Sequence, residues 1–139
     1  MKQLILFCFF GIFFVGCNKK DSTPANPLAE ALQSGTWRIN NFNLAGIDKT
    51  AQFSGATFTF KSNGNVSVTT GTNSYTGSWS YGYVSNPNGS QLTMTIVFTS
   101  PPVFADLTAS WNANGLFPTN VTLLKISSTG SDFLSFTKN

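Results

Sequence analysis

Beyond residue 35, apolar and polar side chains alternate along most of the chain with a period of two. This is the pattern of β-strands that bury one face. In residues 75–83, aromatic side chains share one face with a glycine, and Thr, Ser and Gly occupy the other face. In residues 92–99, Leu, Met, Ile and Phe alternate with threonine. Neighbouring strands of this kind predict an antiparallel sheet with one strongly apolar face.

The same alternation predicts eight strands in all. They are expected at residues 36–44, 56–61, 65–70, 75–83, 92–99, 107–113, 120–127 and 132–138. The apolar parity shifts within the first strand, which predicts a β-bulge near Asn40 and Asn41. Asn63 and Gly64 are expected to form a type I′ hairpin turn.

Short connections between consecutive strands favour an all-β, eight-stranded antiparallel up-and-down barrel, because closure of the sheet removes both exposed edges. A two-sheet sandwich is the competing architecture. It needs crossover connections, for which most of the loops are too short. Asn26 and Pro27, followed by an apolar stretch at residues 28–32 and by Gly35, predict a short N-terminal helix. The expected folded domain covers residues 28–139.

The chain before this domain divides into two parts. Residues 4–16 form an uncharged, apolar run of 13 residues behind a single lysine. This run is shorter than the roughly 20 residues that span a bilayer, and it fits a secretory signal peptide. Residues 17–27 are polar and contain two prolines, so we predict a flexible tether there. The predicted organisation is a signal peptide at residues 1–16, a tether at 17–27 and a barrel at 28–139.

The signal peptide ends in Val15-Gly16-Cys17, which resembles the bacterial lipobox. In that family the cysteine thiol is lipidated and the chain is cut just before it. The resemblance implies that Cys17 carries lipid and anchors the protein in the membrane of a bacterial cell envelope. An ordinary cleaved signal peptide with a chance cysteine is the alternative. Asn18 is not the aspartate usually linked to inner-membrane retention, so the outer membrane is favoured.

Composition narrows the possible chemistry. The chain has no histidine and only two cysteines, which excludes His-dependent triads and four-cysteine zinc sites. Glu30, Asp48, Asp106 and Asp132 are unpaired in the sequence, and we expect them to be solvated. We therefore expect no enzyme activity, no metal and no cofactor. Cleavage before Cys17 leaves seven basic and five acidic residues, a net charge of 7 − 5 = +2, which does not predict nucleic-acid binding.

Five short motifs carry a family resemblance. Gly35-Thr36-Trp37 resembles the Gly-x-Trp signature of lipocalins. Similar to short lipocalin-like domains of bacterial surface lipoproteins, the chain continues with Phe-x-Phe-x-x-x-Gly at 58–64, Gly-x-Trp at 77–79, Leu-Thr at 92–93 and Phe-x-Lys at 136–138. The resemblance covers residues 32–139. It implies a lipocalin-like barrel in which Gly35 and Trp37 are structural. Lipocalins also place an arginine late in the chain, and Lys138 is the possible substitute here.

The expected inward-facing stripe leaves two interpretations open. It comprises Phe58, Phe60, Trp79, Tyr81, Tyr83, Met94, Ile96 and Phe98. These residues either pack as a solid core, since an eight-stranded barrel is just wide enough for its own side chains, or line a cup for one small apolar or amphipathic ligand. The first hypothesis is a membrane-anchored, non-catalytic ligand-binding lipoprotein. The alternative is an envelope protein–protein interaction or inhibitor module, with loops 45–55 or 100–106 as its contact surface.

Overall fold

The structure is a computed structural model that describes residues 26–127 and 130–139. The signal peptide, Cys17 and most of the tether lie outside the described residues, so the expectations for them stay predictions. No helix in the described part of the chain has the length and apolar character needed to cross a membrane.

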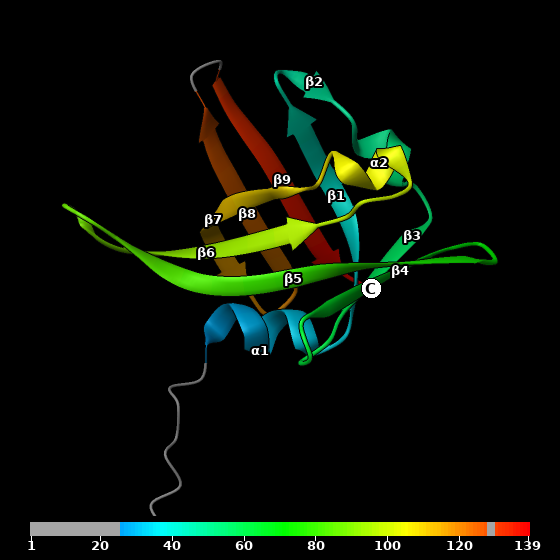
Figure 1. Cartoon of the computed structure of the whole chain (residues 1–139), viewed down its shortest axis with the longest axis horizontal. Coiled ribbons are helices and arrows are strands. Elements are labelled where there is room, and N and C mark those ends of the chain that lie inside the picture. The colour runs from blue at the N-terminus through cyan, green and yellow to red at the C-terminus, as the bar shows by residue number, and fades with distance from the viewer. Residues whose placement is uncertain (1–25, 128–129) are drawn as a thin grey trace, which may run out of the picture.

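The described chain forms an eight-stranded antiparallel barrel (Figure 1). Its strands are β1 (Thr36–Leu44), β3 (Ala56–Phe60), β4 (Asn65–Thr70), β5 (Asn73–Asn86), β6 (Gly89–Val97), β7 (Ala109–Phe117), β8 (Asn120–Ser127) and β9 (Gly130–Lys138). Each strand pairs with the next one in this order, and β1 also pairs with β9, which closes the sheet. The predicted up-and-down barrel is confirmed. A short strand, β2 (Ile47–Asp48), extends β1 as a hairpin.

Local predictions for the strands have mixed outcomes. The bulge is confirmed, because the register of β1 against β9 shifts between Ile39 and Asn41. The type I′ turn is wrong. Gly64 has a φ of 83°, whereas Asn63 is not among the described residues with positive φ. The Gly64 amide donates to the Lys61 carbonyl at 3.1 Å, and the Asn63 side chain accepts from the Asn65 amide at 3.0 Å. This is a three-residue loop that ends in a left-handed glycine.

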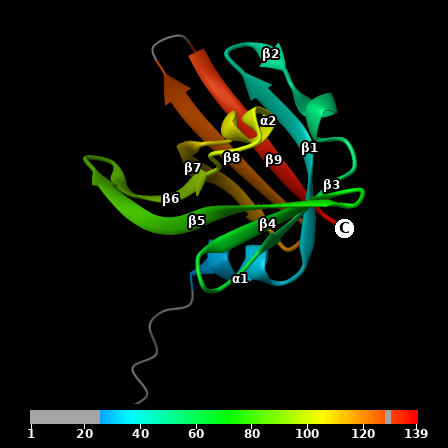
Figure 2. The same cartoon turned by 45° about the vertical axis from the view of Figure 1, so that its right-hand side comes forward.

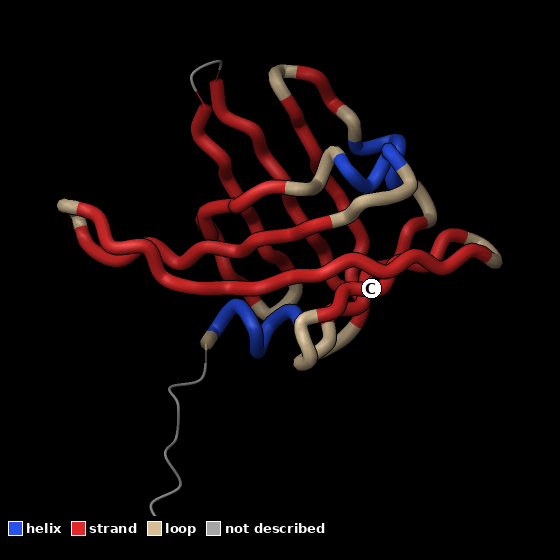
Figure 3. Tube along the Cα trace, viewed as in Figure 1, coloured by secondary structure: helices blue, strands red, loops and turns tan. Residues whose placement is uncertain are grey.

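A short helix closes one end of the barrel, which we call the α1 end (Figures 1 and 3). The helix α1 (Pro27–Gln33) begins behind Asn26, whose side chain accepts hydrogen bonds from the backbone amides of Leu28 and Ala29. This N-cap satisfies amides that have no partner inside the helix. Leu28 and Leu32 are fully buried against the barrel, and the helix contacts β1, β3, β7 and β8. The predicted N-terminal helix is confirmed.

Two helical turns close the opposite end, which we call the α2 end. They are η1 (Thr50–Phe53) and α2 (Pro102–Ala105), and both lie across the barrel from α1 (Figure 2). Each places one phenylalanine, Phe53 or Phe104, in the core. Four residues do not complete a helical repeat of hydrophobicity, so the alternation pattern could not indicate these turns.

Candidate functional site

Six of the eight predicted lining residues lie in the core of the barrel. They are Phe58, Phe60, Trp79, Met94, Ile96 and Phe98. Phe58 and Phe60 of β3 both pack against Phe136 of β9, with ring centroids 5.4 and 5.5 Å apart. Phe60 also meets Trp79 of β5 at 5.4 Å. These edge-on contacts join rings from three strands into one layer.

Phe104 joins that layer to the α2 end. Its ring lies 5.3–6.2 Å from the rings of Phe53, Phe58, Tyr75 and Phe98, measured between centroids. A connected aromatic cluster therefore runs from α2 through the barrel to Trp79. Rings at these separations are in packing contact, and this supports the packed-core interpretation over a ligand cup.

Tyr81 and Tyr83 lie outside the core, although they share the Trp79 face of β5. Their exposed fractions are 47% and 60%, so the predicted stripe leaves the barrel after Trp79. The ladder between β4 and β5 ends at Ser78, and the ladder between β6 and β7 begins at Thr93. Residues 80–92, which we call the β5–β6 arm, project beyond the barrel wall (Figure 1). Alternation predicts on which face of its strand a side chain lies, but it does not predict where the neighbouring strands end.

The outer edge of the β5–β6 arm has backbone amides without a β4 partner. The Trp79 amide donates to the Gly64 carbonyl at 2.8 Å and so points to the β4 side. Amide directions alternate along a strand, and the register of β5 against β6 is continuous from Ser78 to Asn86. The amides of Tyr81, Tyr83 and Ser85 therefore point to the same side, beyond the last residue of the β4 ladder. The arm has no charged residue, whereas exposed edges usually carry charges that block pairing.

The three tryptophans hold other segments to the barrel through their indole N–H groups. Trp37 donates to the Leu32 carbonyl at 2.9 Å, which fixes the last turn of α1. Trp79 donates to the Lys61 carbonyl at 2.9 Å, and Trp111 donates to the Leu107 carbonyl, just after α2, at 3.1 Å. Each indole thus combines burial with a hydrogen bond to a segment that leads into or out of the sheet.

The two Gly-x-Trp motifs have distinct steric reasons for glycine. A Cβ at Gly77 would lie 2.5 Å from the Val97 carbonyl oxygen and 2.7 Å from the Phe98 ring. Only glycine fits there without movement of the backbone. A Cβ at Gly35 would instead lie 2.7 Å from Cε of Lys138, whose flexible chain crosses this position.

A pocket of about 460 Å³ lies outside the barrel, between α1 and the turn that joins β7 to β8. We call it the α1 pocket. Its lining comprises Pro27, Glu30, Ala31, Ser34, Leu116, Phe117, Pro118 and Lys138. Phe117 is 63% exposed at its rim. Sequence patterns did not indicate this pocket, because it joins residues about 90 positions apart through the closure of the sheet.

Charged groups are paired at the α2 end. Lys49 contacts Asp106 at 2.6 Å, and Lys125 contacts Asp132 at 3.2 Å. The expectation that Asp132 is solvated is wrong, since this residue is 5% exposed. Its carboxylate accepts a hydrogen bond from the Ala45 amide at 2.8 Å, and this bond, with help from Lys125, lowers the pKa of Asp132 against the effect of burial. Hydrogen bonds from Thr50 similarly lower the pKa of Asp48.

Basic groups at the α1 end have no such partners in the part of the chain that the structure describes. Among the described residues, Arg38, Lys61 and Lys138 form no ion pair. Lys138 Nζ donates to Ser34 Oγ at 3.1 Å in a solvent-exposed hydrogen bond. The described residues bring together no cluster of three or more His, Cys, Asp or Glu that could hold a metal ion.

The strand topology and the core side chains define the structural class of the protein: an eight-stranded antiparallel barrel with an aromatic core and two capped ends. A scan against protein-family models and a search of curated proteins give no match. Among solved structures, the chain is similar to a DUF4847 family protein from Bacteroides vulgatus ATCC 8482, at 15% identity and a TM-score of 0.49. The alignment covers 81% of this chain and 97% of that chain. The likeness carries no functional information, and the predicted lipocalin resemblance is confirmed only as far as the barrel.

Proposed function

We propose that the protein is a lipid-anchored, non-catalytic module of the bacterial envelope that binds a partner protein on the outside of a solid barrel. The observation that carries this proposal is the contrast between a core packed with aromatic rings and a β5–β6 arm with an open edge. The packed interior supports the interaction module over a ligand carrier.

The partner would add an extended segment to the outer edge of β5. The amides of Tyr81, Tyr83 and Ser85 are available to pair with such a strand, and paired main chains give affinity in this mode of recognition. Exposed tyrosines supply large contact area with little loss of conformational freedom. Because the arm carries no charge, the fitting segment is itself uncharged and extended.

A photo-crosslinking residue in place of Tyr83, in intact cells, tests this surface. The expected result is one discrete adduct with an envelope protein. The same crosslinker in place of Ile126, which is 77% exposed on β8, is the matched control and should not give that adduct. The proposal would be contradicted if position 83 gave no adduct, or if positions 83 and 126 gave the same adduct.

A proline variant then tests strand addition itself. Ser85→Pro removes an amide that points away from β6, so the arm hairpin keeps its internal ladder. We expect the adduct at position 83 to fall about tenfold, the scale of a well-placed interface contact. Ser85→Thr keeps the amide and should keep the adduct. An unchanged yield in Ser85→Pro would exclude pairing along this edge.

The anchor has its own test in the two cysteines. Cys17→Ser should abolish lipidation and release the protein from membranes or block its processing. Cys8→Ser changes a cysteine within the signal peptide and should leave lipidation intact. Normal membrane retention of Cys17→Ser would overturn the anchor.

A small amphipathic ligand is the second candidate, and the α1 pocket favours it. Its volume of about 460 Å³ lies in the range of small-molecule sites. Its lining is mostly apolar and includes the charged side chains of Glu30 and Lys138. A fluorescent fatty acid should bind the full chain. It should not bind the Ala31→Trp variant, in which the new indole ring fills the pocket. Gln33→Trp places the same ring on the exposed side of α1 and should bind normally. Equal binding by both variants would exclude the α1 pocket.

A further inference from the structure

We propose that the α1 end of the barrel rests on the lipid surface, with Phe117 among the head groups and Lys61 and Lys138 facing anionic lipid. This orientation rests on the proposed anchor at Cys17 and adds a docking face to it. The occupant of the α1 pocket region is then the membrane itself, and the β5–β6 arm is left free for a partner.

The place where the chain enters the barrel is the first argument. α1 begins at Pro27, so nine residues separate it from Cys17. A flexible chain of this length has a root-mean-square reach of about 17 Å. The nine residues of β1, by comparison, extend about 30 Å. The anchor therefore keeps the α1 end near the lipid and the α2 end away from it (Figure 1).

Exposed apolar surface is the second argument. Phe117 is 63% exposed beside Leu116 and Pro118, at the turn between β7 and β8. Aromatic side chains are enriched at the membrane interface, where the ring enters the acyl boundary and polar groups stay wet. Exposure of Phe117 to water is unfavourable, and this docking removes it.

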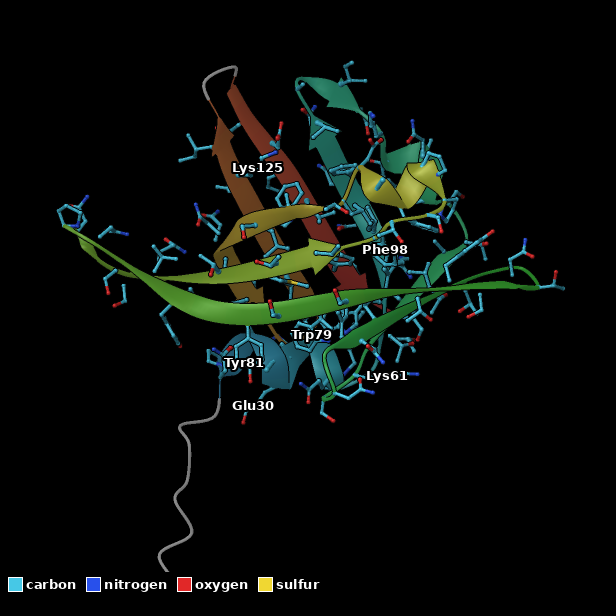
Figure 4. The ribbon with its side chains drawn as sticks, in the orientation of Figure 1. Glu30, Lys61, Trp79, Tyr81, Phe98 and Lys125 are labelled. Atoms are coloured by element: carbon cyan, nitrogen blue, oxygen red, sulfur yellow. The ribbon has the colours of Figure 1, made fainter. Side chains whose placement is uncertain are left out.

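Charge is the third argument. Glu30 belongs to α1 and Lys61 lies toward the α1 end, whereas Lys125 lies toward the α2 end (Figure 4). Lys61 and Lys138 form no ion pair among the described residues, while Lys49 and Lys125 are neutralised by aspartates. A basic residue near an anionic bilayer is attracted to its surface. Glu30 is the acidic side chain that opposes this attraction on the described α1 end.

Depth-dependent quenching on the full lipidated chain tests the orientation. The thiol of Cys17 is blocked by lipid and Cys8 leaves with the signal peptide, so Thr119→Cys and Ile126→Cys each introduce one reactive thiol. Thr119 is an exposed residue of the turn that carries Phe117, so the label reports on this turn while Phe117 itself stays in place. Both proteins are labelled with the same fluorophore and reconstituted into vesicles of phosphatidylethanolamine, phosphatidylglycerol and nitroxide-labelled phosphatidylcholine. We expect the label at 119 to be quenched at least about threefold more than the label at 126, as for a residue within the interface.

Flotation of both proteins with the vesicles is measured first. Loss of flotation would overturn the anchor and the docking with it, whereas flotation with equal quenching at 119 and 126 would overturn the docking alone. Equal quenching together with a response of the 119 label to free fatty acid would assign the α1 pocket to a soluble amphiphile instead.

A charge variant checks the contribution of the lysines. Lys61→Glu, added to Thr119→Cys, should lower the quenching ratio by about half without loss of flotation, because it replaces one attraction by a repulsion. Lys49→Gln at the α2 end is the matched control and should leave the ratio unchanged. Equal ratios in the two variants would overturn the role of charge in docking.

Discussion

The two ends of the barrel are closed by different means. At the α1 end, an amphipathic helix buries Leu28 and Leu32, and the Trp37 indole fixes its last turn. At the α2 end, the rings of Phe53 and Phe104 enter the core, and two lysine–aspartate pairs lie around them. One end is thus closed by aliphatic packing, and its basic groups form no ion pair within the described part of the chain. The other is closed by aromatic packing and neutralises its charges.

Because the two ends are closed differently, their stability should respond differently to pH and salt. Burial of apolar side chains depends little on pH or salt, whereas ion pairs and buried carboxylates depend on both. We therefore expect acid to weaken the α2 end first, while the α1 end keeps its closure and its positive charge. Within residues 26–127 and 130–139, Lys49 and Lys125 of the α2 end are paired with aspartates, whereas Lys61 and Lys138 of the α1 end form no ion pair.

The largest expected effect is that of Phe104→Ala. The substitution removes the ring that joins Phe53, Phe58, Tyr75 and Phe98, and truncation of a buried phenylalanine costs about 3–5 kcal/mol. Urea unfolding followed by tryptophan fluorescence measures this loss. Val103→Ala, in the same helical turn but only partly buried, should cost less than half as much. Similar losses would mean that the ring cluster does not close the α2 end.

The corresponding change at the α1 end is Leu32→Ala. Leu32 is fully buried, and a buried leucine truncated to alanine costs about 2–5 kcal/mol, at the lower end where the site can collapse. We expect about 3 kcal/mol here, because a seven-residue helix at the barrel end can shift inward. Gln33→Ala on the exposed side of α1 should change stability by less than about 0.5 kcal/mol. A negligible effect of Leu32→Ala would show that α1 is not part of the folded unit.

The comparison of the ends also shows what the sequence could predict. Strict alternation predicted the closed barrel, because it follows from one apolar face and short connections. Asn26 and Pro27 predicted α1, because capping is local chemistry. The closure by α2 could not be predicted, since Phe104 lies in a four-residue turn without a helical repeat. Asp132 was misjudged for a similar reason: its partner Ala45 lies 87 residues away, in a turn that only the closed sheet brings near.

The candidate surfaces were predicted less well than the core. Trp79, Tyr81 and Tyr83 follow one alternation, yet only Trp79 is buried. Their fates differ because β4 begins at Asn65, opposite Ser78, and the length of a neighbouring strand leaves no mark in the alternation of β5. The α1 pocket depends in the same way on β7, β9 and α1 meeting in space. Periodicity therefore predicted a core, while strand length and closure decided which surfaces are available for binding.

Asp132→Asn tests the acid sensitivity of the α2 end. The fold lowers the pKa of Asp132 below its usual value of 3.8. A lowered pKa means that the carboxylate contributes stability above the unfolded-state pKa, and that this contribution is lost as pH falls through the folded-state pKa. We expect Asp132→Asn to cost about 1–2 kcal/mol at neutral pH, the cost of a weakened buried hydrogen bond to a charged group. The difference in the free energy of unfolding between this variant and the unmodified protein should become smaller in acid.

Unfolding by urea at neutral pH and again in acid measures this difference. Asp48, whose pKa is also lowered, is unchanged in the variant and so cancels in the comparison. A difference that is the same at both pH values would contradict the assignment of the acid sensitivity to Asp132.

The smallest expected effect on stability comes from the loss of a lysine–aspartate ion pair. Lys49 and Asp106 are both partly exposed, and such pairs contribute about 0–1 kcal/mol and are screened by salt. Lys49→Met should therefore destabilise the fold slightly at low salt and not at high salt. Lys61→Met at the α1 end removes a lysine that has no described carboxylate partner, so it should cost nothing at either salt concentration. Calorimetric melting of both variants in low and high salt measures the difference. If Lys61→Met were the more salt-sensitive of the two, the charges of the α1 end would already be engaged within the fold, and they could not serve to attract lipid.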